Sequence, residues 1–174
     1  MTMKQDPYEL LGIERTFEID PDLLQKRYVA LSAQHHPDKF VDPIEQMDAA
    51  EMSSSINTAF QSLKDDELRA NVLLELMGGP TKEQDKSLPP TLLMEMMEVR
   101  EEMEEAVEQK NNDVVQKLRQ WAIEEREEYL GMLGQLFAKI GKDQVTEEQG
   151  KQIRLHLNSL RYIERMLEQT PEEV

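Results

Sequence analysis

Two side chains of different chemistry, those of His36 and Asp38, lie on either side of Pro37. An imidazole and a carboxylate can act together as a general acid–base pair. No nucleophile and no oxyanion donor lies nearby in the sequence, so a hydrolytic site lacks its other parts. An enzyme that uses His36 and Asp38 is kept as an alternative, which turnover without any other protein would support.

The same region raises the question of a metal site, because His35 and His36 are adjacent. Adjacent histidines do not share a helix face, and no second group of ligands supports them. The sequence contains no Cys, which excludes disulfides and thiolate ligands. We therefore expect no metal and no other cofactor.

Pro37 predicts how these groups are presented. Proline disfavours the α conformation in the residue before it and has no N–H to donate, so the preceding helix should end near His36. We therefore expect one exposed turn to present the His36 imidazole, the Pro37 ring, the Asp38 carboxylate and the Lys39 ammonium together.

Helical patterns lie on both sides of this turn, and each begins with an Asp-Pro pair, Asp20-Pro21 and Asp42-Pro43. The first helix carries an apolar stripe of Leu24, Tyr28, Leu31 and His35. The second carries Met52, Ile56, Ala59, Phe60 and Leu63. The facing stripes predict an antiparallel helical hairpin, with Lys26 on the opposite face of its helix and Arg27 at the edge. A short helix within residues 6–12 precedes it, with Asp6 as N-cap, Pro7 at the first position and Gly12 as the stop.

The composition favours a helical protein and excludes some partners. Charged residues make up 32% and aromatic residues 5% of the 174 residues, a mixture typical of an all-α fold. The net charge of −16 argues against nucleic acid, because phosphate binding needs a positive surface. No apolar run is long enough to span a bilayer, and the segment from Met1 to Asp6 does not resemble a signal peptide. We expect a cytoplasmic protein that binds no membrane.

A break in the helical pattern predicts two domains. The helix over residues 66–77 stops at Gly78-Gly79-Pro80, and the polar stretch 79–90 is the predicted linker. The first domain is then residues 1–78 and the second residues 91–174.

The second domain consists of three long helical segments, over residues 91–110, 113–140 and 146–169. Thr146 and Gln149 form a capping box for the last of them. Short connections between long helices predict an antiparallel three-helix bundle.

The first helix of this bundle has more apolar residues than one buried face requires. Its core stripe consists of Leu92, Met96, Val99, Met103 and Val107. The residues that project away from this stripe are Leu93, Met94 and Met97, alongside Glu98, Arg100 and Glu101. Contiguous exposed apolar surface usually marks a partner site.

The last helix repeats the pattern. Its core stripe consists of Ile153, Leu157, Leu160 and Leu167, with Ile163 at the margin. Leu155, Tyr162 and Met166 lie on the opposite face. Both surfaces predict a partner site, and the alternative is that the first domain packs over one of them.

Roughly the first seventy residues resemble J-domains, the modules that stimulate ATP hydrolysis by DnaK-type chaperones. The matching elements are residues 6–13, the basic Lys26-Arg27-Tyr28, the His36-Pro37-Asp38 turn and residues 56–63, with Arg69 following. The resemblance implies docking on the chaperone through Lys26, Arg27 and the turn with its Lys39. His36 and Pro37 would hold the shape of the turn, and Asp38 would accept hydrogen bonds from a partner arginine.

The whole chain resembles the HscB-type co-chaperones of iron–sulfur cluster assembly, in which a J-domain precedes an acidic three-helix bundle. The family's Lys-Phe continuation is present in His36-Pro37-Asp38-Lys39-Phe40. Residues 93–102 match its scaffold-binding segment, and residues 160–163 match the region of its aromatic contact. Met97 stands where Leu is usual and Tyr162 where Phe is common, and both keep the bulk. The four-cysteine metal module found at the N-terminus of some relatives is absent from this sequence.

This resemblance implies a non-enzymatic adaptor with two partners. One is an HscA/DnaK-type chaperone, whose ATPase the J-domain would stimulate, and the other is an IscU-type scaffold protein, which carries the cluster and which the bundle would bring to the chaperone. The scaffold-binding residues implied are Leu93, Met94, Met97, Glu98, Arg100, Glu101 and Tyr162. A J-domain protein with a different client is the alternative, and it would differ only in the bundle surface.

Overall fold

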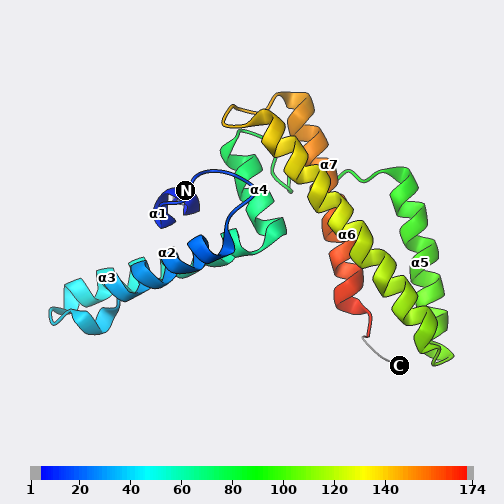
Figure 1. The fold of residues 1–174 in the computed structure, drawn as a ribbon, viewed down its shortest axis with the longest axis horizontal. Coiled ribbons are helices and arrows are strands. Elements are labelled where there is room, and N and C mark those ends of the chain that lie inside the picture. Colours follow the sequence, from blue (N-terminus) through cyan, green and yellow to red (C-terminus); the bar gives the residue numbers. More distant parts are fainter. Residues whose placement is uncertain (1–4, 172–174) are drawn as a thin grey trace. The chain divides into compact units, whose positions relative to one another are not determined.

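The structure, a computed structural model, describes residues 5–171. In this range it contains seven α-helices and one 3-10 turn and no strand (Figure 1), so the prediction of an all-helical chain is confirmed. The chain divides into two compact units, Met1–Leu76 and Met77–Val174. The prediction that no signal peptide is present concerns mainly residues 1–4, which lie outside the described range.

None of the helices between residues 5 and 171 combines the length and the apolarity that crossing a membrane requires.

The first unit contains α1 (Pro7–Leu11), α2 (Pro21–Gln34), α3 (Pro43–Lys64) and α4 (Asp66–Leu76). The first three begin as predicted, because Asp6, Asp20 and Asp42 cap them by accepting hydrogen bonds from backbone N–H groups of the first turn. Gly12 ends α1 with a φ of 63°, a left-handed conformation that glycine adopts without strain.

The predicted hairpin is formed by α2 and α3, and aromatic packing joins them. The rings of Tyr28 and Phe60 are stacked with centroids 4.1 Å apart, and the Tyr28 hydroxyl donates to Asn57 Oδ1 at 2.7 Å. In the same unit Ile56 of α3 is fully buried, and α1, which carries the fully buried Tyr8, packs against α3. Burial raises the pKa of the Tyr8 hydroxyl, which stays protonated and donates to the Thr16 carbonyl at 3.0 Å. This packing fixes the two helices that flank the His36-Pro37-Asp38 turn.

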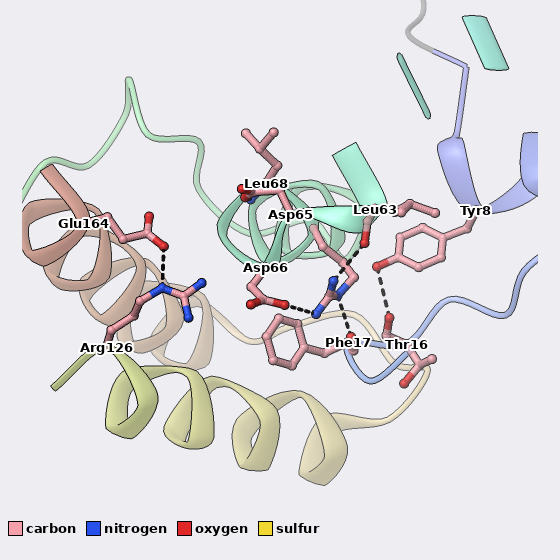
Figure 2. Close-up of polar contacts among 10 residues, drawn as sticks. Tyr8, Thr16, Phe17, Leu63, Asp65, Asp66, Leu68, Arg126 and Glu164 are labelled. Atoms are coloured by element: carbon pink, nitrogen blue, oxygen red, sulfur yellow. Dashed lines mark hydrogen bonds and ion pairs between the residues drawn. The ribbon is translucent and has the colours of Figure 1, made fainter. Parts of the chain in front are cut away.

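Arg69 attaches α4 to the rest of the first unit by binding Phe17, Leu63 and Asp66, which are labelled in Figure 2. Its nearly buried guanidinium donates from Nε to the Phe17 carbonyl at 2.7 Å and from Nη1 to the Leu63 carbonyl at 2.8 Å. A third donation, from Nη2 to Asp66 Oδ1 at 2.6 Å, neutralises the charge. A buried arginine is tolerated only when it is paired and hydrogen-bonded in this way.

The second unit contains α5 (Pro90–Glu108), α6 (Asn112–Ile140) and α7 (Glu147–Gln169), and α6 packs against both other helices (Figure 1). The capping box of Thr146 and Gln149 is present at the start of α7. An ion pair between Arg126 and Glu164, with Nε and Oε1 3.1 Å apart, links α6 to α7 (Figure 2).

Residues 77–89, which we call the connecting segment, contain no α-helix but are bound to α7. Arg154 is 1% exposed and donates from Nε and Nη2 to the Pro80 carbonyl at 3.0 and 2.8 Å. Asn158 Nδ2 donates to the carbonyls of Asp85 and Ser87 at 3.2 and 3.0 Å. Much of the stretch assigned above to a linker therefore belongs structurally to the second unit.

The predicted faces of α7 need correction. Ile163, placed at the margin of the core, is fully buried together with Leu92, Met96 and Ala122. Met166, predicted on the opposite face, is partly buried and packs against that cluster, and Leu155 is also half-buried. The reason is that α7 is covered by α5, α6 and the connecting segment, so a wider arc of it is buried than one stripe.

Candidate functional site

The His36-Pro37-Asp38 turn lies at the end of the α2–α3 hairpin (Figure 1), where Pro37–Lys39 forms a single 3-10 turn. α2 ends at Gln34 with His35 as its C-cap, close to the predicted end. His36 is the N-cap of the turn, and its Nδ1 accepts the backbone N–H of Asp38 at 3.3 Å. The backbone N–H of Lys39 donates to the His36 carbonyl at 3.0 Å, so the turn has a defined shape.

The chemistry available at this turn is that of a docking site. His36 Nδ1 and Asp38 Oδ2 are 3.6 Å apart, and their side chains are 58% and 87% exposed. A ring nitrogen that accepts the Asp38 N–H cannot also donate a proton to the carboxylate. Both side chains are open to solvent, so the pair lacks the enclosed pocket in which catalytic acid–base pairs usually hold a substrate. The Asp38 carboxylate can instead accept hydrogen bonds from a partner.

The predicted basic residues are exposed on α2 and in the turn that follows it. Lys26 and Arg27 lie on α2 and are exposed, as is Lys39 in the turn. Within residues 5–171, neither Lys26 nor Arg27 has an ion-pair partner. The first unit thus presents two exposed cations on α2 and, in the turn that follows α2, the Lys39 ammonium and the Asp38 carboxylate.

In the part of the chain that the structure describes, no three His, Cys, Asp or Glu residues are arranged so that they could hold a metal ion.

The predicted scaffold-binding residues of the second unit are exposed. Leu93, Met94, Met97 and Tyr162 are 41%, 65%, 57% and 37% exposed, and Glu98, Arg100 and Glu101 are exposed as well. Met96, one residue before Met97, is 2% exposed. The predicted division of α5 into a core face and a free face is therefore confirmed.

A groove between α5 and α7, with a volume of about 680 Å³, brings part of this set together. Met97 and Arg100 line it from α5, and Tyr162 lines it from α7. The other predicted residues, Leu93, Met94, Glu98 and Glu101, lie on α5 outside the groove. The candidate site thus has an inner part that joins two helices and an outer part on α5 alone.

The groove also has charged residues that the sequence analysis missed, among them Glu104, Glu108 and Arg165. Arg100 is ion-paired with Glu104, with Nε and Oε1 3.0 Å apart. A signal for them existed, because Glu104 follows Arg100 by four residues and Arg165 follows Tyr162 by three, so each pair shares a helix face.

Two family models match this chain, one within each of its two compact units. Residues 6–72 match the DnaJ domain, and residues 88–170 match the HSCB C-terminal oligomerisation domain. A co-chaperone protein HscB homolog from Burkholderia mallei is 31% identical over 156 residues, which cover 88% of this chain and 89% of that protein. A homolog from Vibrio cholerae is 41% identical over 100 residues, 56% of this chain, and the match spans only 58% of that relative's length.

Solved structures show the same architecture. The chaperone HscB from Vibrio cholerae superposes with a TM-score of 0.79 at 27% identity, over 94% of each chain. The human co-chaperone protein HscB superposes with a TM-score of 0.81 over 97% of this chain and 81% of that one, and at 22% identity it supports the fold alone.

A DnaJ domain followed by this helical domain defines the class, a J-domain protein with a dedicated C-terminal bundle. The chain belongs to the HscB family of co-chaperones. The resemblance drawn from the sequence is thereby confirmed, and a non-enzymatic role agrees with this family.

Proposed function

We propose that this protein stimulates the ATPase of an HscA/DnaK-type chaperone and delivers an IscU-type scaffold protein to it during iron–sulfur cluster assembly in the cytoplasm. The observation that carries the proposal is the presence of two exposed surfaces, one on each unit. The first is the His36-Pro37-Asp38 turn together with the exposed cations of α2, and the second is the apolar surface of α5 and α7.

At the chaperone, the turn provides a shaped hydrogen-bonding surface. His36 and Pro37 set the turn, because one caps it and the other fixes φ. The Asp38 carboxylate then accepts charge-assisted hydrogen bonds from a partner arginine. Lys26, Arg27 and Lys39 favour an acidic chaperone surface and increase the rate of encounter, even though the chain as a whole is acidic.

At the scaffold, the contact is apolar with a charged rim. Leu93, Met94, Met97 and Tyr162 supply adaptable apolar anchors, since methionine side chains adjust to irregular surfaces. The charged residues beside them, Glu98, Arg100 and Glu101, set the orientation of the scaffold. Because both partners bind one chain, the scaffold reaches a high effective concentration at the chaperone.

The chaperone half of this proposal is tested by measuring steady-state ATPase of the chaperone against increasing concentrations of this protein. His36→Gln should abolish stimulation without loss of helicity, because His36 is exposed and contributes to the turn rather than to the core. The matched control is His35→Gln, the same change at the half-buried C-cap of α2, which should still stimulate. Stimulation by His36→Gln equal to wild type would refute the role of the turn.

A further inference from the structure

Three apolar residues directly after the turn are exposed to solvent. Val41, Ile44 and Met47 are 93%, 67% and 58% exposed, and we call them the apolar ridge. Val41 follows Phe40, and Ile44 and Met47 lie in the first two turns of α3. Single exposed apolar residues are normal on a protein surface, but three in succession at a spacing of three indicate a contact surface.

The ridge does not belong to the core of the first unit. Met47 precedes the fully buried Ile56 by nine residues, which is half a turn out of phase in an α-helix. Ala49, seven residues before Ile56 and in phase with it, is buried. The start of α3 therefore has a small residue on its buried face and larger apolar residues toward solvent.

Hydrogen bonds hold the ridge in place beside the turn. The side-chain amide of Gln46 donates from Nε2 to the Phe40 carbonyl at 2.8 Å, which ties the first turn of α3 to the end of the loop. Asp42 Oδ1 accepts the backbone N–H of Ile44 at 2.8 Å. α3 also packs directly against the 3-10 turn, and Val41 follows Lys39 by two residues, so the ridge begins next to the turn that carries Asp38.

We propose that the apolar ridge is a second contact for the ATPase chaperone that binds the His36-Pro37-Asp38 turn. The inference rests on the proposed function, because the occupant is argued from the continuity of the ridge with that turn. The flanks of the ridge are the exposed acids Asp42, Glu45 and Asp48, opposite in sign to Lys26 and Arg27. The matching chaperone surface is an apolar patch with no acidic group opposite Asp42, Glu45 and Asp48, and it adjoins the acidic region that meets α2.

Such a pairing gives selectivity among chaperones. In a chaperone with an acidic group opposite the ridge, that group would be repelled by the carboxylates of Asp42 and Glu45. Such a chaperone would also lose the apolar contact. Apolar contact is also insensitive to screening, so it should persist at high salt where contacts of Lys26 and Arg27 weaken.

The test is chaperone ATPase stimulated by the full chain carrying Val41→Thr and Ile44→Gln together. The concentration for half-maximal stimulation should rise about tenfold, as expected for loss of modest apolar burial, while the maximal rate stays near wild type. The increase should remain at high salt. The matched control is Leu68→Gln, which changes an apolar residue of α4 that is 45% exposed and should leave the half-maximal concentration unchanged.

Each other outcome has a distinct meaning. A half-maximal concentration equal to wild type in the double variant, while His36→Gln is inactive, overturns the ridge and leaves the proposed function intact. Stimulation by His36→Gln overturns the proposed function, and the ridge with it. If sedimentation shows wild-type dimers that the double variant lacks, the ridge binds a second copy of the chain and the proposal is wrong.

Discussion

At the scale of single residues, Met96 and Met97 are neighbours on α5 with very different exposure, and we propose that Met96 serves folding and Met97 serves binding. Met96 is 2% exposed and packs with Leu92, Ala122 and Ile163. Met97 is 57% exposed and lines the groove with Tyr162, whereas Met96 reaches the same groove only from its buried side. The same residue type is therefore buried at one position and exposed at the next, depending on the helix face.

Replacing each methionine by alanine should separate these roles. Met96→Ala should lower the free energy of unfolding by about 2–5 kcal/mol, the usual cost of truncating a buried methionine, with little direct effect on scaffold binding. Met97→Ala should change stability by less than about 0.5 kcal/mol yet weaken scaffold binding about thirtyfold, or about 2 kcal/mol. Thermal unfolding and titration calorimetry measure the two effects. Early melting of Met97→Ala together with failed binding by Met96→Ala would mean that the two faces are reversed.

Other residues important for the fold could not be predicted from the sequence. Periodicity identifies apolar positions, but it gives no sign that Arg69 or Arg154 is buried, because the partners are backbone carbonyls far away in the chain. Arg69 reaches Phe17, 52 residues earlier, and Arg154 reaches Pro80, 74 residues earlier. Only the folded chain brings such pairs together.

At the scale of elements, local signals predicted the helices well. The Asp-Pro starts of α1, α2 and α3 and the capping box of α7 depend on neighbouring residues alone, so they can be read before folding. Which part of α7 is buried depends on three neighbouring elements at once. That is why the margin residue Ile163 is central to the core and the expected surface residue Met166 is partly covered.

The connecting segment depends on a glycine of α7 for its close approach. A Cβ at Gly150 would lie 3.0 Å from Pro80 Cδ and 3.3 Å from Val145 Cγ2, both tighter than ordinary contacts. Pro80 cannot easily withdraw, because Arg154 holds its carbonyl. Gly131 of α6, by contrast, has open space where its Cβ would be.

Glycine-to-alanine changes at these two helix positions should have opposite effects. Gly131→Ala should raise stability by about 0.5–1 kcal/mol, because alanine favours the helix and restricts the unfolded chain. In Gly150→Ala the new methyl group should crowd Pro80 and Val145, and this cost should exceed the gain in helix stability. The melting temperature should therefore fall, and hydrogen exchange in residues 77–89 should become faster. Equal stabilisation by both variants in thermal unfolding would show that the connecting segment does not need the glycine.

At the scale of the whole molecule, the two proposed binding surfaces lie on different units of one acidic chain. Neither surface borrows a residue from the other unit, since the turn lies within Met1–Leu76 and the groove within Met77–Val174. The two activities should therefore be separable by mutation. Delivery, however, requires both surfaces on one chain, because only then does the second binding event become intramolecular.

The most direct test of this account is chaperone ATPase measured with this protein, with the scaffold, and with both together. We expect the combined stimulation to exceed the sum of the two separate ones. Met97→Ala should keep the stimulation by the co-chaperone alone but lose the excess, whereas His36→Gln should lose both. Additive stimulation by the wild-type protein, or an undiminished excess with Met97→Ala at scaffold concentrations below saturation, would contradict delivery of the scaffold through the surface of α5 and α7.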